Sequence, residues 1–174
     1  AASDVYKRQW GEVASLNTAR WQHGAAAVGN VIFVVGGGDA DENALSSVEA
    51  LDLSADGGRW EEKASMPTAR YDLAVAASGT KLFAVGGFDN TGYACDTLEV
   101  YESATDSWSA AAPMPTARYG LAAAIVGNTL FALGGMGDRG PLDVVEAYDI
   151  EGGSWSAAEP MATPRMYFAA VAGP

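Results

Sequence analysis

The sequence repeats with a period of about fifty residues, and this periodicity limits the possible folds more than any other feature. Four arginines mark the repeat at spacings of 50, 48 and 47 residues, and a tryptophan precedes each arginine by ten positions. A glycine pair follows each of the first three arginines, and a glutamate follows each pair. The marks are Trp10, Trp60, Trp108, Trp155; Arg20, Arg70, Arg118, Arg165; Gly36, Gly37, Gly86, Gly87, Gly134, Gly135; Glu49, Glu99 and Glu146. Periods of this length are typical of solenoids and propellers.

Each repeat is predicted to contain four short β-strands. The expected strands of the second repeat are Tyr71–Ser78, Lys81–Gly87, Thr97–Glu102 and a segment that begins at Ser107. Four strands in each unit of about 40 to 50 residues are typical of a propeller blade. The first strand of each repeat is rich in small residues and the last opens with tryptophan. Small residues suit an inner strand at a crowded axis, and tryptophan suits an outer strand at a roomier rim.

The repeats predict an all-β fold, a β-propeller fragment with three complete four-stranded blades plus single strands of flanking blades. The complete blades are expected at about residues 20–66, 70–114 and 118–161, within a propeller region of residues 10–174. The single strands are expected to begin at Trp10 and to run toward Pro174. Because unpaired strand edges attract other strands, we expect the chain to self-associate through open blade edges.

The first nine residues stand apart from the repeats. Ala1–Gln9 reads AASDVYKRQ, which resembles the translation of an adapter used in sequencing libraries. We therefore expect these residues to be an artefact and the natural N-terminus to lie outside the sequence.

The repeat resembles the kelch motif. Tyr101 precedes Trp108 by seven residues, the third repeat keeps this spacing, and the stretches that end at Arg70 and Arg118 both read Met-Pro-Thr-Ala-Arg. The first repeat departs from the motif at Leu51, where a tyrosine is expected, so its Trp60 is expected to pack differently. A WD40 propeller would need a shorter period and a Trp-Asp pair, and no tryptophan here precedes an aspartate.

The resemblance implies closed rings of roughly five to seven blades, which three blades cannot complete. It also implies a protein-interaction scaffold that binds a peptide or protein partner on its loop face, with substrate-recruiting adaptors among its relatives. The alternative is a fragment of a kelch-like enzyme, of the oxidase or sugar epimerase type, whose catalytic residues lie in blades outside this sequence. We favour the scaffold and expect no catalytic residues in this chain.

Composition and charge limit the partners. The net charge of −12 would repel nucleic acid and anionic membranes, and no apolar run is long enough to span a bilayer. The chain has one cysteine, Cys95, and no Asn-x-Ser/Thr acceptor, from which we expect an intracellular, cytoplasmic protein.

Metal and cofactor sites are not predicted. The loop that begins at Asp39 starts like an EF-hand, but Ala44 and Ala50 stand where that motif needs glycine and glutamate. His23 is the only histidine, whereas a copper site of the galactose-oxidase type needs two. The sequence also lacks the common nucleophile and phosphate-loop motifs.

Residues that repeat in every blade are predicted to hold the fold, and residues that vary between blades are candidates for binding. The variable positions follow each arginine and each glycine pair: Trp21, Tyr71, Tyr119, Met166, Asp39, Phe88, Asn90, Met136, Asp138 and Arg139. From these we predict six partner-binding residues: Tyr71, Phe88, Asn90, Tyr119, Met136 and Arg139. The alternative is that Tyr71 and Tyr119 are half-buried strand residues with no role in binding.

Overall fold

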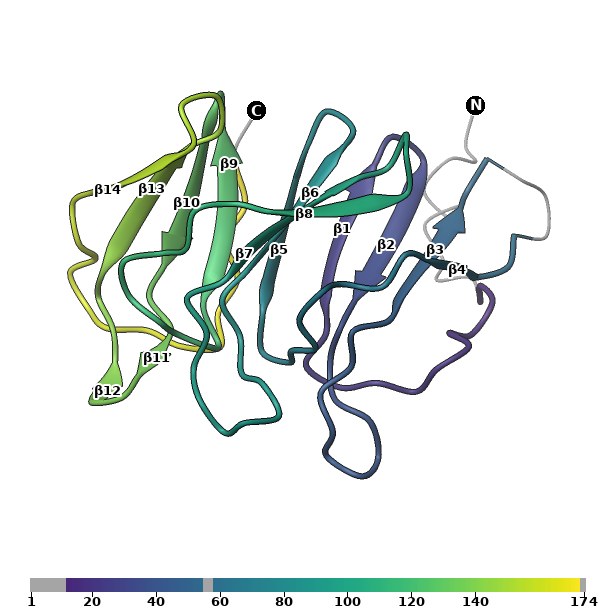
Figure 1. The fold of residues 1–174 in the computed structure, drawn as a ribbon, viewed down its shortest axis with the longest axis horizontal. Helices are drawn as coiled ribbons and strands as arrows, with labels where there is room; N and C mark the ends of the chain where they lie inside the picture. Colours follow the sequence, from purple (N-terminus) through teal and green to yellow (C-terminus); the bar gives the residue numbers. More distant parts are fainter. Residues whose placement is uncertain (1–11, 55–57, 173–174) are drawn as a thin grey trace, which may run out of the picture.

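The computed structural model describes residues 12–54 and 58–172. This part of the chain contains three four-stranded antiparallel sheets, in which the strands pair in chain order, and no helix (Figure 1). Blade 1 consists of β1 (Gly24–Val28), β2 (Val31–Val35), β3 (Val48–Asp52) and β4 (Glu61–Lys63). Blade 2 consists of β5 (Ala74–Ser78), β6 (Lys81–Val85), β7 (Leu98–Glu102) and β8 (Ser107–Ala110). Blade 3 consists of β9 (Ala122–Val126), β10 (Thr129–Leu133), β13 (Val145–Asp149) and β14 (Ser154–Ala157).

The first strands of neighbouring blades lie beside one another, β1 against β5 and β5 against β9 (Figure 1). The predicted inner position of the small-residue strands is therefore confirmed. The approach is close enough that a side chain on Gly24 would clash with Val75 of the next blade. A larger residue at this inner position would push the two blades apart.

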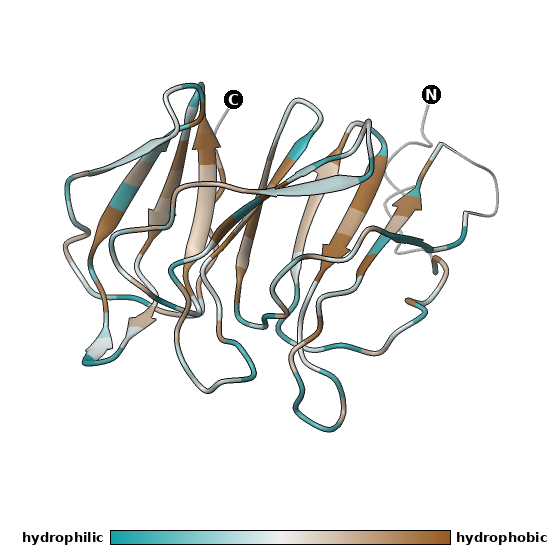
Figure 2. Ribbon diagram, viewed as in Figure 1, coloured by the Kyte–Doolittle hydropathy of each residue, from teal (hydrophilic) through white to brown (hydrophobic). Residues whose placement is uncertain are grey.

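The middle strands bury both of their faces. Along β6, Leu82 and Ala84 pack against blade 1, whereas Phe83 and Val85 pack against blade 3. Successive side chains of a strand point to opposite faces, so a strand between two blades must be apolar throughout. Figure 2 shows apolar residues concentrated along the strands and hydrophilic residues in the connections.

β5 begins later and β6 ends earlier than the sequence indicates, whereas β7 ends at Glu102 and β8 begins at Ser107 as predicted. β5 starts at Ala74 rather than Tyr71 because Asp72 has a left-handed backbone, with φ of 53°. β6 stops at Val85 because Gly86 and Gly87 have φ of 63° and 109°, outside the β region. The predicted lone strands at the two ends also differ. Residues 12–20 and 166–172 contain no strand, and Trp10 lies outside the described residues.

Each outer tryptophan joins its blade to the segment that precedes it. Trp108 Nε1 donates to the carbonyl of Ala64 at 2.8 Å, and Trp60 and Trp155 make the same bond to residues 14 and 112. Trp108 also packs on Tyr101 with ring centroids 5.2 Å apart. Leu51 gives Trp60 no such aromatic partner in its own blade, yet the hydrogen bond to the preceding segment is kept.

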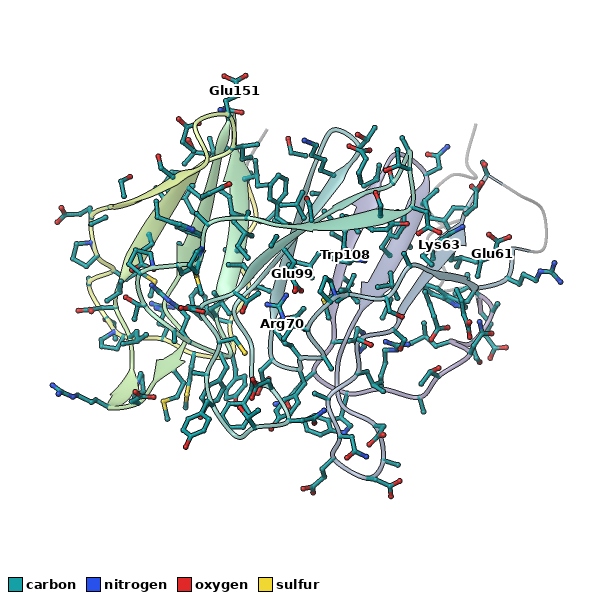
Figure 3. The ribbon with its side chains drawn as sticks, viewed as in Figure 1. Glu61, Lys63, Arg70, Glu99, Trp108 and Glu151 are labelled. Atoms are coloured by element: carbon teal, nitrogen blue, oxygen red, sulfur yellow. The ribbon has the colours of Figure 1, made fainter. Side chains whose placement is uncertain are left out.

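The repeated arginine and glutamate form an ion pair inside every blade. Arg70 Nη2 lies 2.8 Å from Glu99 Oε2, and both side chains are buried (Figure 3). Arg70 Nη1 also donates to the carbonyl of Gly86 at 2.5 Å, and Thr68 Oγ1 donates to Glu99 at 2.8 Å. The same pair occurs as Arg20–Glu49 and Arg118–Glu146.

The backbone of each arginine from Arg70 onward binds the blade before it. The amide of Gly37 in blade 1 donates to the Arg70 carbonyl at 2.9 Å, and the Arg70 amide donates to Leu45 at 3.1 Å. A Cβ added to Gly36 would lie 2.5 Å from that same carbonyl, so only glycine fits. The arginine and the glycine pair recur together in the repeats because they form the joint between neighbouring blades.

We predict that Glu99→Gln lowers the free energy of unfolding by about 3 to 5 kcal/mol, because it leaves the buried Arg70 charge without a counterion. Glu61→Gln is the control: its carboxylate pairs with Lys63 at 3.0 Å on the surface, so its loss should cost less than about 1 kcal/mol (Figure 3). Urea unfolding of both variants measures the difference. Equal costs would contradict a stabilising role for the buried pair.

Candidate functional site

The loops that follow the glycine pairs gather at one end of the blades, which we call the loop face (Figure 1). They comprise residues 36–47, 86–97 and 134–144, and the last contains a two-stranded ribbon of β11 (Met136–Gly137) and β12 (Gly140–Pro141). Because these loops vary while the strands repeat, differences between the blades are concentrated here.

Aromatic rings form a continuous row across the loop face. Ring centroids lie 5.0 Å apart between Trp21 and Tyr71, 5.5 Å between Tyr71 and Phe88, and 5.0 Å between Phe88 and Tyr119. The row therefore crosses from blade 1 through blade 2 to blade 3. We call Trp21, Tyr71, Phe88 and Tyr119 the aromatic row.

Backbone pairing positions the row. The residue after each arginine pairs with a residue after the glycine pair: Tyr71 and Phe88 exchange amide hydrogen bonds of 3.0 and 2.8 Å. Tyr119 and Met136 are paired in the same way, at 3.1 and 2.7 Å. Trp21 is fixed by its Nε1, which donates to the carbonyl of Asp39 at 2.7 Å.

The structure brings together four of the six predicted binding residues. Tyr71, Phe88, Tyr119 and Met136 are adjacent and half-buried, so each presents part of its surface to solvent. Their half-buried state also fits the alternative interpretation, under which the two tyrosines only pack. Exposed Trp21 extends the row beyond the six.

The other two predicted residues lie apart from the row. The side chain of Asn90 accepts from the Ala44 amide at 2.7 Å and donates to the Ala44 carbonyl at 3.3 Å. Asn90 thus ties the blade 2 loop to the blade 1 loop, which is a structural role that the sequence did not indicate. Arg139 is exposed at the tip of the β11–β12 ribbon.

A second set of residues, missed in the sequence, lies two positions after each arginine. Their backbones are linked from blade to blade: Asp72 donates to Gln22 at 2.9 Å, Gly120 to Asp72 at 2.9 Å, and Tyr167 to Gly120 at 2.8 Å. All four have left-handed φ values between 48° and 59°. For residues other than glycine this conformation is uncommon, and it occurs often at functional sites.

Asp72 and Tyr167 meet across this chain of hydrogen bonds. The hydroxyl of Tyr167 donates to Asp72 Oδ2 at 3.2 Å, and the ring of Tyr167 lies over Gly120, where an added Cβ would be 3.0 Å from Cε1. Gly120 therefore leaves the room that lets Tyr167 reach back to blade 2. The sequence did carry a signal for these residues: the second position after the arginine holds a different residue in every repeat, as the positions of the aromatic row do.

Burial and charge shift the pKa values at this site. Burial raises the pKa of Asp72 to about 6. Burial also raises the pKa of Tyr71, and the nearby negative charges of Asp72 and two loop carboxylates raise it further; the two are Glu42 and Asp89. The aromatic row therefore lies in a negative field.

The described residues contain no cluster of side chains suited to metal binding. Within residues 12–54 and 58–172, no group of three or more His, Cys, Asp or Glu side chains is placed to hold a metal ion. Burial raises the pKa of the Cys95 thiol to about 11, which keeps it protonated and unreactive.

A cavity of about 660 Å³ lies between blades 1 and 2 at the end away from the loops, with Phe33, Tyr101 and Asp106 in its wall.

We predict that Asp72→Asn removes a pH dependence of stability. Because folding raises the Asp72 pKa from 3.8 to about 6, the folded state binds the extra proton and the wild-type chain loses stability as pH rises through this window. Relative to Asp72→Asn, the wild type should lose about 2 to 3 kcal/mol between pH 4 and pH 7. Denaturant titrations at both pH values measure this. The control Asp138→Asn changes an exposed residue, so its free energy of unfolding should depend on pH as that of the wild type does. The same pH dependence in all three proteins would contradict the burial of a charged Asp72.

Comparison with known families agrees with the repeat and with the blades. The model of the KLHDC2/KLHL20/DRC7 Kelch-repeats domain matches residues 3–172, which include all three blades, the aromatic row and Asp72. No curated protein is similar enough to count as a relative. The match confirms the resemblance that the glycine pairs and the Tyr–Trp spacing indicated. The chain belongs to the KLHDC2/KLHL20/DRC7 family of kelch-repeat domains.

Proposed function

We propose that this kelch domain binds an extended segment of a partner protein on its loop face, through the aromatic row. Membership of a kelch-repeat family supports a protein-interaction propeller in general. The observation that carries the finer proposal is the unbroken line of four rings across three blades, with neighbouring centroids 5.0 to 5.5 Å apart.

The row has the properties of an interface anchor. Aromatic side chains offer a large contact area and lose little conformational entropy on binding, and they are enriched among residues that dominate binding energy. Paired backbones hold Tyr71, Phe88 and Tyr119 in place before a partner arrives, which reduces the cost of ordering them. Exposed Met166 and Arg139 extend the surface beyond the row.

An adaptor role, in which the bound partner is a substrate brought to another protein, is part of this proposal. The enzymatic alternative has no supporting observation in the described residues, since no convergent catalytic groups line the inner strands.

Self-association through open blade edges stays an expectation. Within residues 12–54 and 58–172, no helix is long and apolar enough to cross a membrane.

We predict that Phe88→Ala and Tyr119→Ala each weaken partner binding by about thirtyfold, equivalent to about 2 kcal/mol. Peptides that bind the wild-type chain are first selected from a random displayed peptide library. The selected peptides are then synthesised and titrated by calorimetry against the wild type and the variants. The control is Val126→Ala, an exposed apolar residue at the opposite end of blade 3, which should leave the affinity unchanged.

Thermal melts of the same proteins separate binding from packing. Folded aromatic variants that bind the selected peptides normally would place the binding surface elsewhere, on the other end or on the outer strands. Variants that melt far below the wild type would show that the rings serve the core, as the alternative interpretation holds.

A further inference from the structure

Asp72 is a buried charge that pairs with no cation in the described part of the chain. Among the described residues, the buried charged side chains other than Asp72 all belong to the Arg–Glu pairs. Asp72 is only 8% exposed, and the one side-chain hydrogen bond that its carboxylate accepts comes from Tyr167 at 3.2 Å. Buried carboxylates are normally paired, because removing the charge from water costs several kcal/mol.

The surroundings of Asp72 suit a positive charge. Tyr167 contacts the carboxylate, and Tyr71 and Tyr119 are close enough to influence the pKa of Tyr167. The faces of aromatic rings attract cations, with energies of about 1 to 2 kcal/mol when the cation is partly desolvated. A carboxylate beside several tyrosines combines a counterion with cation–π partners.

The charges on the neighbouring loops favour the same ligand. Glu42 and Asp89 act on Tyr71 from the loops of blades 1 and 2, and the chain as a whole carries −12. Exposed Arg139 is held out at the tip of the β11–β12 ribbon. An anionic ligand would be repelled here, and a bound metal ion would need more than one carboxylate.

We propose that Asp72, with Tyr71, Tyr119 and Tyr167, forms a subsite for a lysine or arginine side chain of the bound segment. This inference rests on the proposed function, because the subsite adjoins the aromatic row at Tyr71 and Tyr119. The partner is an extended segment in which a basic residue neighbours an apolar one. The apolar side chain packs on the row while the cation neutralises Asp72.

The stability cost of Asp72 supports a role in binding. A carboxylate whose pKa is raised by burial destabilises the folded chain at neutral pH relative to an uncharged side chain of the same shape. Asparagine accepts the same left-handed backbone, and Asp72→Asn should therefore fold at least as well as the wild type. Loss of binding in this variant cannot then be attributed to unfolding.

The test uses the peptides selected on the wild-type chain whose affinity falls with Tyr119→Ala. These peptides should contain lysine or arginine, and Asp72→Asn should weaken their binding by about tenfold. Asp41→Asn removes the same charge from an exposed position in the blade 1 loop of the loop face and should change the affinity by less than about twofold. Replacing the basic peptide residue with glutamine should abolish the effect of Asp72→Asn.

A pH series adds a readout specific to the carboxylate. Between about pH 7.5 and pH 5 the wild type should lose affinity as Asp72 takes up a proton, whereas Asp72→Asn should not. Burial raises the pKa of Tyr71 and raises the pKa of Tyr167 to about 12, so neither hydroxyl loses its proton in this range. His23, whose pKa is lowered by burial, is present in both proteins and cancels in the comparison.

The outcomes separate this inference from the proposed function. Peptides that depend on Tyr119 but lack basic residues, or that bind Asp72→Asn as tightly as the wild type, would overturn the cation subsite and leave loop-face binding intact. Selected peptides that do not depend on the aromatic row would overturn both.

Discussion

The buried Arg–Glu pair is the interaction on which the rest of this structure depends. Inside blade 2, Glu99 neutralises Arg70, and the guanidinium also binds the carbonyl of Gly86. The backbone of the same arginine accepts the amide of Gly37 from blade 1. One residue therefore closes its own blade with its side chain and joins the previous blade with its main chain. A buried pair of this kind need not add net stability over an apolar core, but its loss is costly and its geometry is specific.

Three consecutive residues of the chain have three different roles. Arg70 belongs to the framework, Tyr71 to the aromatic row, and Asp72 to the proposed cation subsite. Because the arginine is fixed on two sides, the next two residues leave the blade at a defined place. The left-handed backbone at Asp72 then turns the chain into the inner strand that begins at Ala74. The repeat therefore places the two positions after the arginine at the same point of every blade, while the side chains at these positions differ between blades.

The sequence predicted the framework well because the framework repeats. Register between marks such as Arg70 and Glu99 indicated structural residues, and the blades and small inner strands followed from it. The strand ends were wrong where the backbone turns left-handed, which depends on contacts with the neighbouring blade. Asn90 was placed among binding residues because it varies, although its hydrogen bonds to Ala44 connect two loops. The contact between Asp72 and Tyr167 spans 95 residues and requires an absent side chain at Gly120, which no local pattern reveals.

Native-state hydrogen exchange of the glycine amides tests most directly whether the ion pair holds the joint between blades. The Gly37 amide binds the Arg70 carbonyl, and the Gly87 amide binds the Arg118 carbonyl in the equivalent joint of the next blade. In the Glu99→Gln protein, protection of Gly37 should fall well below that of Gly87, because only the first joint has lost its counterion. Equal loss at both glycines, or no loss at Gly37, would show that the joint does not depend on the Arg–Glu pair.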